Sequence, residues 1–135
     1  MTPRQQTTLL VIGDCAVFVA FAVIGLSNHE EGITLNGILR NAMPFGAGWF
    51  FFATLYGLMA PGWYRAPDAP WQRVANAWLP GWLLGLILRS VYVWRFPAPI
   101  FASIVLITAG IMILLWRMSA AWLLRRSREP HLTKP

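Results

Sequence analysis

Residues 8–26, TLLVIGDCAVFVAFAVIGL, decide the fold class of this chain. The run is almost wholly apolar and contains one carboxylate, Asp14. Because a helix rises about 1.5 Å per residue, a helix of this length is about 28 Å long, close to the ~30 Å hydrocarbon core of a bilayer. Arg4 ahead of an apolar run loosely resembles a signal peptide, but Asp14 interrupts the core that such a peptide needs. We therefore expect a retained membrane-spanning helix.

The composition of the whole chain points to the same environment. Hydrophobic residues make up 57% of the 135 residues, charged residues only 12%, and the mean hydropathy is +0.54. A soluble domain of this size needs a more polar surface. A net charge of +6 would suggest a nucleic-acid partner in a soluble protein, but here most of the cations lie outside the apolar runs. We expect the bilayer as the main partner and no binding of nucleic acid.

Three further apolar runs follow the first, so the sequence predicts an all-α, polytopic membrane protein built as a bundle of four transmembrane helices. The predicted helices are at about 8–26, 44–60, 74–94 and 100–124. They form one domain, residues 1–124, and residues 125–135 form a basic cytoplasmic tail. Between the first two helices, residues 34–41 place apolar side chains at i, i+3, i+4 spacing behind Thr34, which can serve as an N-cap. This pattern predicts a short interfacial helix.

The distribution of cations predicts the orientation. With four spans, the side that holds both termini and the loop between helices two and three carries eight Lys and Arg residues, and the opposite side carries three. Short loops rich in Lys and Arg stay in the cytoplasm. We expect a multi-pass protein of the cell membrane with both termini cytoplasmic.

Small and aromatic side chains mark the helix-packing surfaces. Ala77, Gly81 and Gly85 recur every four residues on the third helix, and Ala53 and Gly57 stand four apart near the end of the second. Small residues at this spacing let two helices approach closely in lipid. Trp78 and Trp82, four apart on the third helix, are either lipid-facing or a surface for a partner helix or a flat cofactor.

Asp14 is the first candidate functional residue, because a charged group inside a membrane helix is costly and usually has a partner. It is either a packing determinant or a relay for protons or ions. Arg89 is an obvious partner, but the two backbones differ in depth by roughly 13 Å when both helices span a ~30 Å core. A backbone group, a Trp indole or Arg117 is therefore favoured as the partner of Asp14. Arg89 is expected to snorkel outward or to meet the turn at residues 29–31.

His29 is the second candidate, as a plain interfacial histidine, a pH-sensitive group or a ligand to the metal of a tetrapyrrole. The chain contains two histidines and one cysteine, too few His and Cys side chains to supply the four ligands of a closed zinc site. No metal site is therefore predicted. The sequence also contains no convincing nucleophile, base and acid set, so we expect no enzyme activity. No cofactor is expected, and contact with a tetrapyrrole, carotenoid or quinone stays open as the alternative.

The order of several short motifs resembles a family of small four-helix membrane proteins from bacteria and archaea, described only as a domain of unknown function. The matching residues are Gly13-Asp14, Gly25, Ser27, His29, Gly32, Ala42, Pro44-Phe45, Gly48-Trp49, Gly85, Arg89, Pro97 and Trp116-Arg117. The resemblance spans about residues 8–117. It implies the four-helix fold and the candidate positions Asp14, His29, Arg89 and Arg117. Leu26 departs from the family, which often has a basic residue there.

These features predict a non-enzymatic, small accessory subunit of a larger membrane complex, such as a photosynthetic or respiratory one. Its partners would be other membrane-protein subunits, or further copies of itself. The alternative is a small proton- or ion-coupled transporter or channel that uses Asp14. Substrate-dependent flux in proteoliposomes, compared between the unmodified chain and an Asp14→Asn variant, separates the two hypotheses.

Overall fold

The computed structural model describes residues 1–30 and 32–127, and every regular element in them is helical. The elements are α1 (Pro3–Ser27), α2 (Leu35–Leu55), the 3₁₀ helix η1 (Trp63–Arg65), α3 (Pro70–Val93) and α4 (Pro99–Arg126). The all-α fold class is confirmed. Of the predicted tail, residues 128–135 lie outside the described residues, and α4 includes residues 125 and 126.

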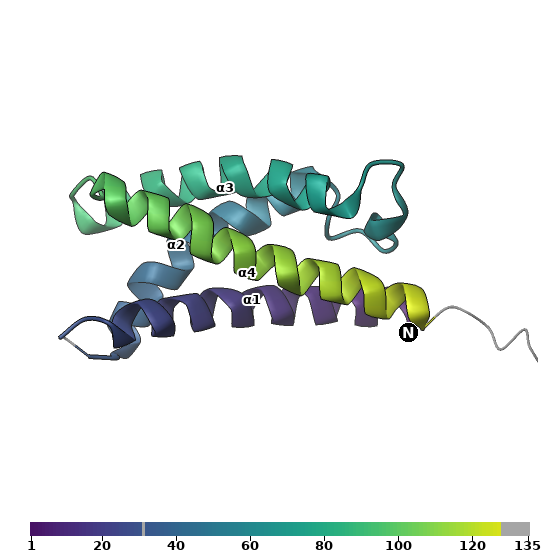
Figure 1. Ribbon diagram of the computed structural model, residues 1–135, viewed down its shortest axis with the longest axis horizontal. Coiled ribbons are helices and arrows are strands. Elements are labelled where there is room, and N and C mark those ends of the chain that lie inside the picture. Colours follow the sequence, from purple (N-terminus) through teal and green to yellow (C-terminus); the bar gives the residue numbers. More distant parts are fainter. Residues whose placement is uncertain (31, 128–135) are drawn as a thin grey trace, which may run out of the picture.

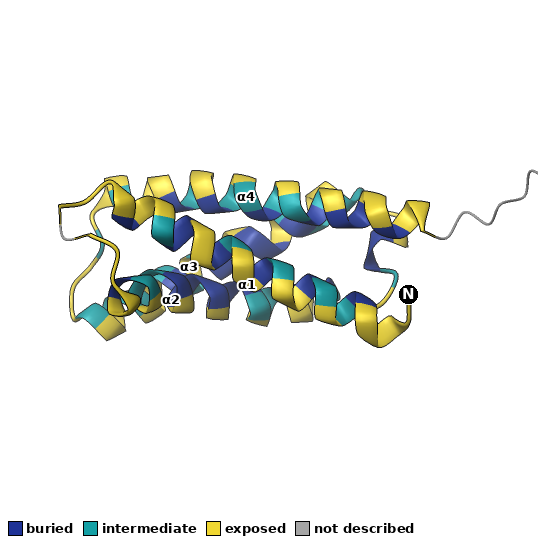
Figure 2. Cartoon of the chain, turned by 90° about the horizontal axis from the view of Figure 1, so that it is seen from below, coloured by how far each residue is buried: buried dark blue, intermediate teal, exposed yellow. Residues whose placement is uncertain are grey.

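The four helices run alternately up and down the long axis of the molecule (Figure 1). The start of α1, the end of α4 and the α2–α3 connection lie at one end of the bundle, called here the terminal end. The α1–α2 and α3–α4 connections lie at the other end, called the turn end. Buried residues face the interior of the bundle, and the outward faces of the helices are exposed along their length (Figure 2).

Three helices, α1, α3 and α4, are long and apolar enough to cross a membrane. The predicted span on α2 is not among them. This helix contains polar Asn36, Arg40 and Asn41 in its first half, which lowers its mean hydropathy. One face of its second half is in the interior of the bundle, where Trp49 and Ala53 are fully buried.

The first helix begins earlier than the sequence predicted. The Thr2 side chain accepts a hydrogen bond from the Gln5 amide at 3.2 Å, and the Gln5 side chain accepts one from the Thr2 amide at 2.8 Å. This reciprocal capping box, followed by Pro3 in the first turn, starts the helix at the chain's polar residues. Residues 3–7, which lie before the first helix predicted from the sequence, are therefore the first turns of α1.

The predicted interfacial helix is not a separate element. Thr34 is an N-cap as expected, with its hydroxyl 3.1 Å from the Gly37 amide, but the helix continues through Pro44 to Leu55. Proline has no amide proton and leaves the carbonyl four residues earlier, that of Arg40, without its helical donor. Nη1 of Arg89 on α3 donates to that carbonyl at 3.1 Å, which supports a continuous α2.

The second helix also ends earlier than predicted, at Leu55 rather than near residue 60. Gly57 has a φ of 71°, and the amide of Leu58 donates to the Ala53 carbonyl at 2.8 Å. This pattern is a Schellman motif, in which glycine takes the left-handed position that closes a helix. The assignment of Gly57 to a helix-packing pair is therefore wrong, whereas Ala53 is fully buried.

The small-residue ridge of α3 packs against α2 within the same chain. A Cβ atom added to Gly48 would lie 2.1 Å from the Gly81 carbonyl oxygen, and one added to Gly85 would lie 2.5 Å from the Phe45 ring. Ala77, the first residue of the ridge, is fully buried. The close approach of α2 and α3 thus depends on glycine at these positions.

The two tryptophans of α3 join it to α4. The Trp78 indole donates to the Leu106 carbonyl and the Trp82 indole to the Ala102 carbonyl, each at 3.0 Å. Trp78 is buried and Trp82 half-buried, so neither is the lipid-facing side chain that the sequence left open. Within this chain, both contact another helix.

Candidate functional site

Asp14 and Arg117 form an ion pair in the interior of the bundle. Asp14 is on α1, Arg117 is on α4, and both side chains have 0% exposure. Nε of Arg117 lies 3.0 Å from Oδ1 of Asp14, and Nη2 lies 2.5 Å from Oδ2. Two parallel bonds of this kind are the strongest geometry for an arginine and a carboxylate. The first and last helices are therefore joined by a bidentate charge pair.

Two indoles complete the environment of the carboxylate. Nε1 of Trp49 on α2 donates to Oδ2 at 2.7 Å, and Nε1 of Trp116 on α4 donates to Oδ1 at 3.0 Å. A carboxylate offers about four acceptor positions, and all four are occupied here. We call Asp14, Trp49, Trp116 and Arg117 the Asp14 cluster.

The Arg117 guanidinium also has partners other than Asp14. Its Nη1 donates to the Leu58 carbonyl at 2.8 Å, and its centre lies 5.3 Å and 5.4 Å from the rings of Trp49 and Trp63. The Schellman turn at Gly57 places Leu58, and hence this carbonyl, at the end of α2. The local sequence at the end of α2 thus provides a hydrogen-bond acceptor for the Arg117 guanidinium on α4.

Gly13 makes room for the second indole. A Cβ atom at this position would lie 1.9 Å from a ring carbon of Trp116, inside van der Waals contact distance. The Trp116 ring therefore crosses α1 directly beside Asp14. Gly13, next to Asp14 on α1, thus leaves the space that is filled by Trp116, next to Arg117 on α4.

The geometry favours the interpretation of Asp14 as a packing determinant. A relay for protons or ions needs an acceptor that can exchange its bonds, whereas this carboxylate is enclosed and fully hydrogen-bonded. Two of the three expected partner types are found, because Arg117 and indoles bind Asp14, whereas the backbone group that was also expected is not among its partners in the described residues. The particular indoles, Trp49 and Trp116, were not identified from the sequence, although both belong to the motifs that carried the family resemblance.

His29 and Arg89 lie at the turn end, away from the Asp14 cluster. Both line a cavity of about 520 Å³ together with Glu30, but Arg89 bonds the Arg40 carbonyl and lies across that cavity from the turn after α1. The Arg89 guanidinium lies 4.5 Å from the centre of the Phe101 ring. Glu31, the last residue of the predicted turn, lies outside the described residues. The predicted separation of Arg89 from Asp14 is consistent with their different partners.

The fold and the Asp14 cluster define a class, that of an all-helical protein with membrane-spanning character whose first and last helices are joined by a buried ion pair. More specifically, the chain belongs to the DUF3054 family, described as a protein of unknown function, whose model matches residues 11–120. This confirms the expected uncharacterised family. No curated protein and no solved structure matches the chain.

Proposed function

We propose that the chain is a small, non-enzymatic accessory subunit of a larger membrane complex, acting by association with other integral membrane proteins. The observation that carries this proposal is the closed Asp14 cluster. Its polar atoms bind one another, with both charged side chains at 0% exposure, so they are not available to a substrate or ion. Association with other subunits through the outward helix faces does not require an accessible charged group.

The outward surface supports this function. On α4, a line of large apolar side chains is exposed, formed by Ile104, Ile107, Ile111 and Leu115. Such a face suits lipid or another apolar helix. Because Gly81 and Gly85 already pack against α2, a partner would meet large side chains rather than the small-residue ridge.

The proposed topology is four spans with both termini in the cytoplasm. The terminal end of the bundle holds both chain ends and the α2–α3 connection (Figure 1). This is the side to which eight of the eleven Lys and Arg residues are assigned by sequence. Reporter fusions at residue 1 and residue 135 should both report a cytoplasmic location, and a periplasmic signal from either would reject this topology.

The geometry of the Asp14 cluster does not support the transporter alternative. A coupling carboxylate has to gain and lose a proton or ion, and Asp14 has no free acceptor position and no exposed surface. Substrate-dependent flux in proteoliposomes that disappears in a folded Asp14→Asn variant would reverse this conclusion. Equal flux, or none, in both proteins agrees with a packing role.

Site-specific cross-linking in the native membrane tests the accessory-subunit proposal. A photoreactive residue is placed at Ile107 on α4 or, as a matched control, at Ile12 on α1, because both side chains are exposed. A specific subunit is expected to be captured from one face only, and to co-purify in mild detergent. Recovery of monomer alone, with capture of lipid but no protein from either face, would overturn the proposal.

A further inference from the structure

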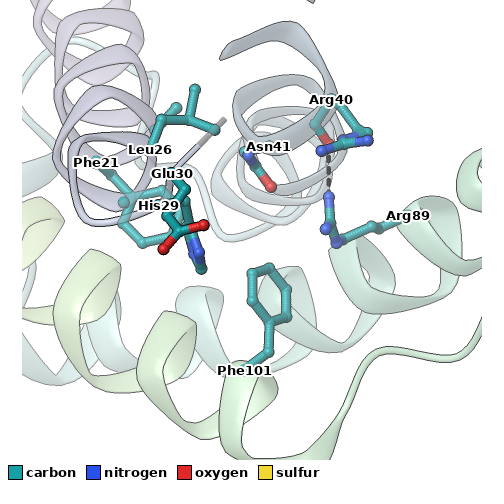
Figure 3. Close-up of a pocket in the computed structure, with 10 residues that line it drawn as sticks. Phe21, Leu26, His29, Glu30, Arg40, Asn41, Arg89 and Phe101 are labelled. Atoms are coloured by element: carbon teal, nitrogen blue, oxygen red, sulfur yellow. Dashed lines mark hydrogen bonds between the residues drawn. The ribbon is translucent and has the colours of Figure 1, made fainter. Parts of the chain in front are cut away.

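The cavity at the turn end is separate from the Asp14 cluster. Its volume is about 520 Å³, within the usual size range of ligand pockets. Figure 3 shows His29 and Glu30 on one side, Arg40 and Arg89 on the other, Asn41 between them and the Phe101 ring across the opening. All four helices and the turn after α1 therefore contribute to one polar recess.

Two guanidinium groups converge on this cavity, and no carboxylate of the described residues is bound to either. Nη1 of Arg89 donates to the backbone carbonyl of Arg40, not to an acidic side chain. Within residues 1–30 and 32–127, the ion pair found is that of Asp14 and Arg117, and neither Arg40 nor Arg89 takes part in it. Two like charges side by side are unfavourable unless an anion lies near them.

Two buried polar atoms of residues that line the cavity also have no hydrogen-bond partner in the described part of the chain. They are Nε of Arg40, a donor, and Oδ1 of Asn41, an acceptor. The Asn41 amide nitrogen is already used, since it donates to the Gly37 carbonyl at 3.0 Å. Buried polar atoms are nearly always hydrogen-bonded in native proteins, so this pair indicates a molecule that offers both an acceptor and a donor.

We propose that this cavity binds a phosphate group that carries a neighbouring hydrogen-bond donor, the chemistry of a phospholipid headgroup. The phosphate oxygens accept from Arg40 and Arg89, for which arginine is the preferred partner. A hydroxyl or ammonium on the same molecule donates to Asn41 and faces Glu30. Phe21 and Leu26, which also line the cavity, provide an apolar wall for the start of a lipid tail.

The position of the cavity in the fold agrees with a lipid ligand. It lies where α1 and α3 end and α4 begins, which is the headgroup level for helices that cross a membrane. Free phosphate has the same polar chemistry, but makes no use of the apolar wall. This inference does not depend on the accessory-subunit proposal, since a lipid site fits a lone chain equally well.

Native mass spectrometry of the full chain, released from detergent micelles, tests the proposal. The probes are short-chain phosphatidylethanolamine and phosphatidylglycerol, inorganic phosphate in a separate arm, and diacylglycerol as a lipid without phosphate. Arg40→Gln removes the guanidinium and keeps the backbone carbonyl that holds Arg89. Arg95→Gln is the matched control, because Arg95 is near the same end of the bundle but does not line this cavity.

We expect one phospholipid per chain, bound about tenfold more weakly by Arg40→Gln, which corresponds to about 1.4 kcal/mol. Arg95→Gln should stay within about twofold of the unmodified chain. Arg40→Lys keeps the charge without the Nε donor and should lose part of the affinity, which preserves the test if Arg40→Gln does not fold.

The remaining outcomes also decide the question. Arg40-dependent binding of inorganic phosphate that matches the phospholipid in affinity would support the site and assign it to free phosphate. Diacylglycerol that binds as well as the phospholipids, or equal phospholipid binding by folded Arg40→Gln, would overturn the proposal. Absence of binding by every probe would overturn it as well.

Discussion

Replacement of Arg117 by methionine is the most direct test of the Asp14 cluster. Methionine keeps much of the apolar stem and removes the guanidinium. The variant loses both bonds to Asp14 and leaves the Leu58 carbonyl without its donor. The carboxylate keeps its two indole donors, but its negative charge is buried without a counter-ion.

The magnitude follows from the hydrogen bonds that this substitution removes. Hydrogen bonds to charged groups contribute about 1.5–3 kcal/mol each, so the two bonds to Asp14 suggest about 3–6 kcal/mol. Removal of one partner from a buried ion pair typically costs about 3–5 kcal/mol. We expect the Arg117→Met variant to lose about 3–5 kcal/mol of unfolding free energy.

The assay is reversible unfolding in mixed micelles by added SDS, followed by tryptophan fluorescence, because Trp49 and Trp116 are in the cluster. Arg126→Met is the matched control, since Arg126 is an exposed residue of the same helix. Surface substitutions of this kind change stability by about 0.5 kcal/mol or less.

A double-mutant cycle then separates the charge pair from general packing. The Asp14→Asn and Arg117→Met double variant should lose clearly less stability than the sum of the two single variants, because both remove the same interaction. A loss below about 1 kcal/mol for Arg117→Met, or strict additivity in the cycle, would refute the interpretation of the cluster as a structural ion pair.

Three further substitutions, one of them with a matched control, test the fold. Gly48→Ala should cost about 1–3 kcal/mol in the same assay, because its Cβ would lie 2.1 Å from the Gly81 carbonyl oxygen. Its control, Gly25→Ala, should be neutral or stabilising because nothing lies within 4 Å of the added Cβ, and equal effects of the two variants would contradict the close helix approach. Gly57→Ala should destabilise by about 1 kcal/mol, since its φ is 71°; an unchanged midpoint would argue against the Schellman turn. Trp78→Phe removes a 3.0 Å bond to a carbonyl of α4 and should cost about 0.5–1.5 kcal/mol; no loss would mean that the bond is dispensable.

The sequence predicted well what depends on length, periodicity and depth. Long apolar runs gave the helical fold class, and three of the four proposed spans are long and apolar enough to cross a membrane. The depth of Asp14 followed from the rise of a helix, which favoured a backbone group, an indole or Arg117 over Arg89 as its partner. Two of these three partner types, the indole and Arg117, are present around the carboxylate.

What the sequence could not give depends on interactions between distant residues. The second helix was predicted to begin at residue 44, but α2 passes through Pro44, where the freed carbonyl of Arg40 accepts from Arg89, which is 49 residues further along the chain. The spacing of Trp78 and Trp82 places them on one face of a helix without saying which neighbour that face meets. Their bonds to α4 therefore required the structure.

The ion pair can form only after both of its helices have been synthesised. Asp14 is on α1 and Arg117 is on α4, 103 residues later, so α1 leaves the ribosome well before α4. Three of the four hydrogen bonds to the carboxylate come from Trp116 and Arg117 on α4, and only the Trp49 bond is available before that helix is made. The acid in α1 is thus without its counter-ion until α4 has been made.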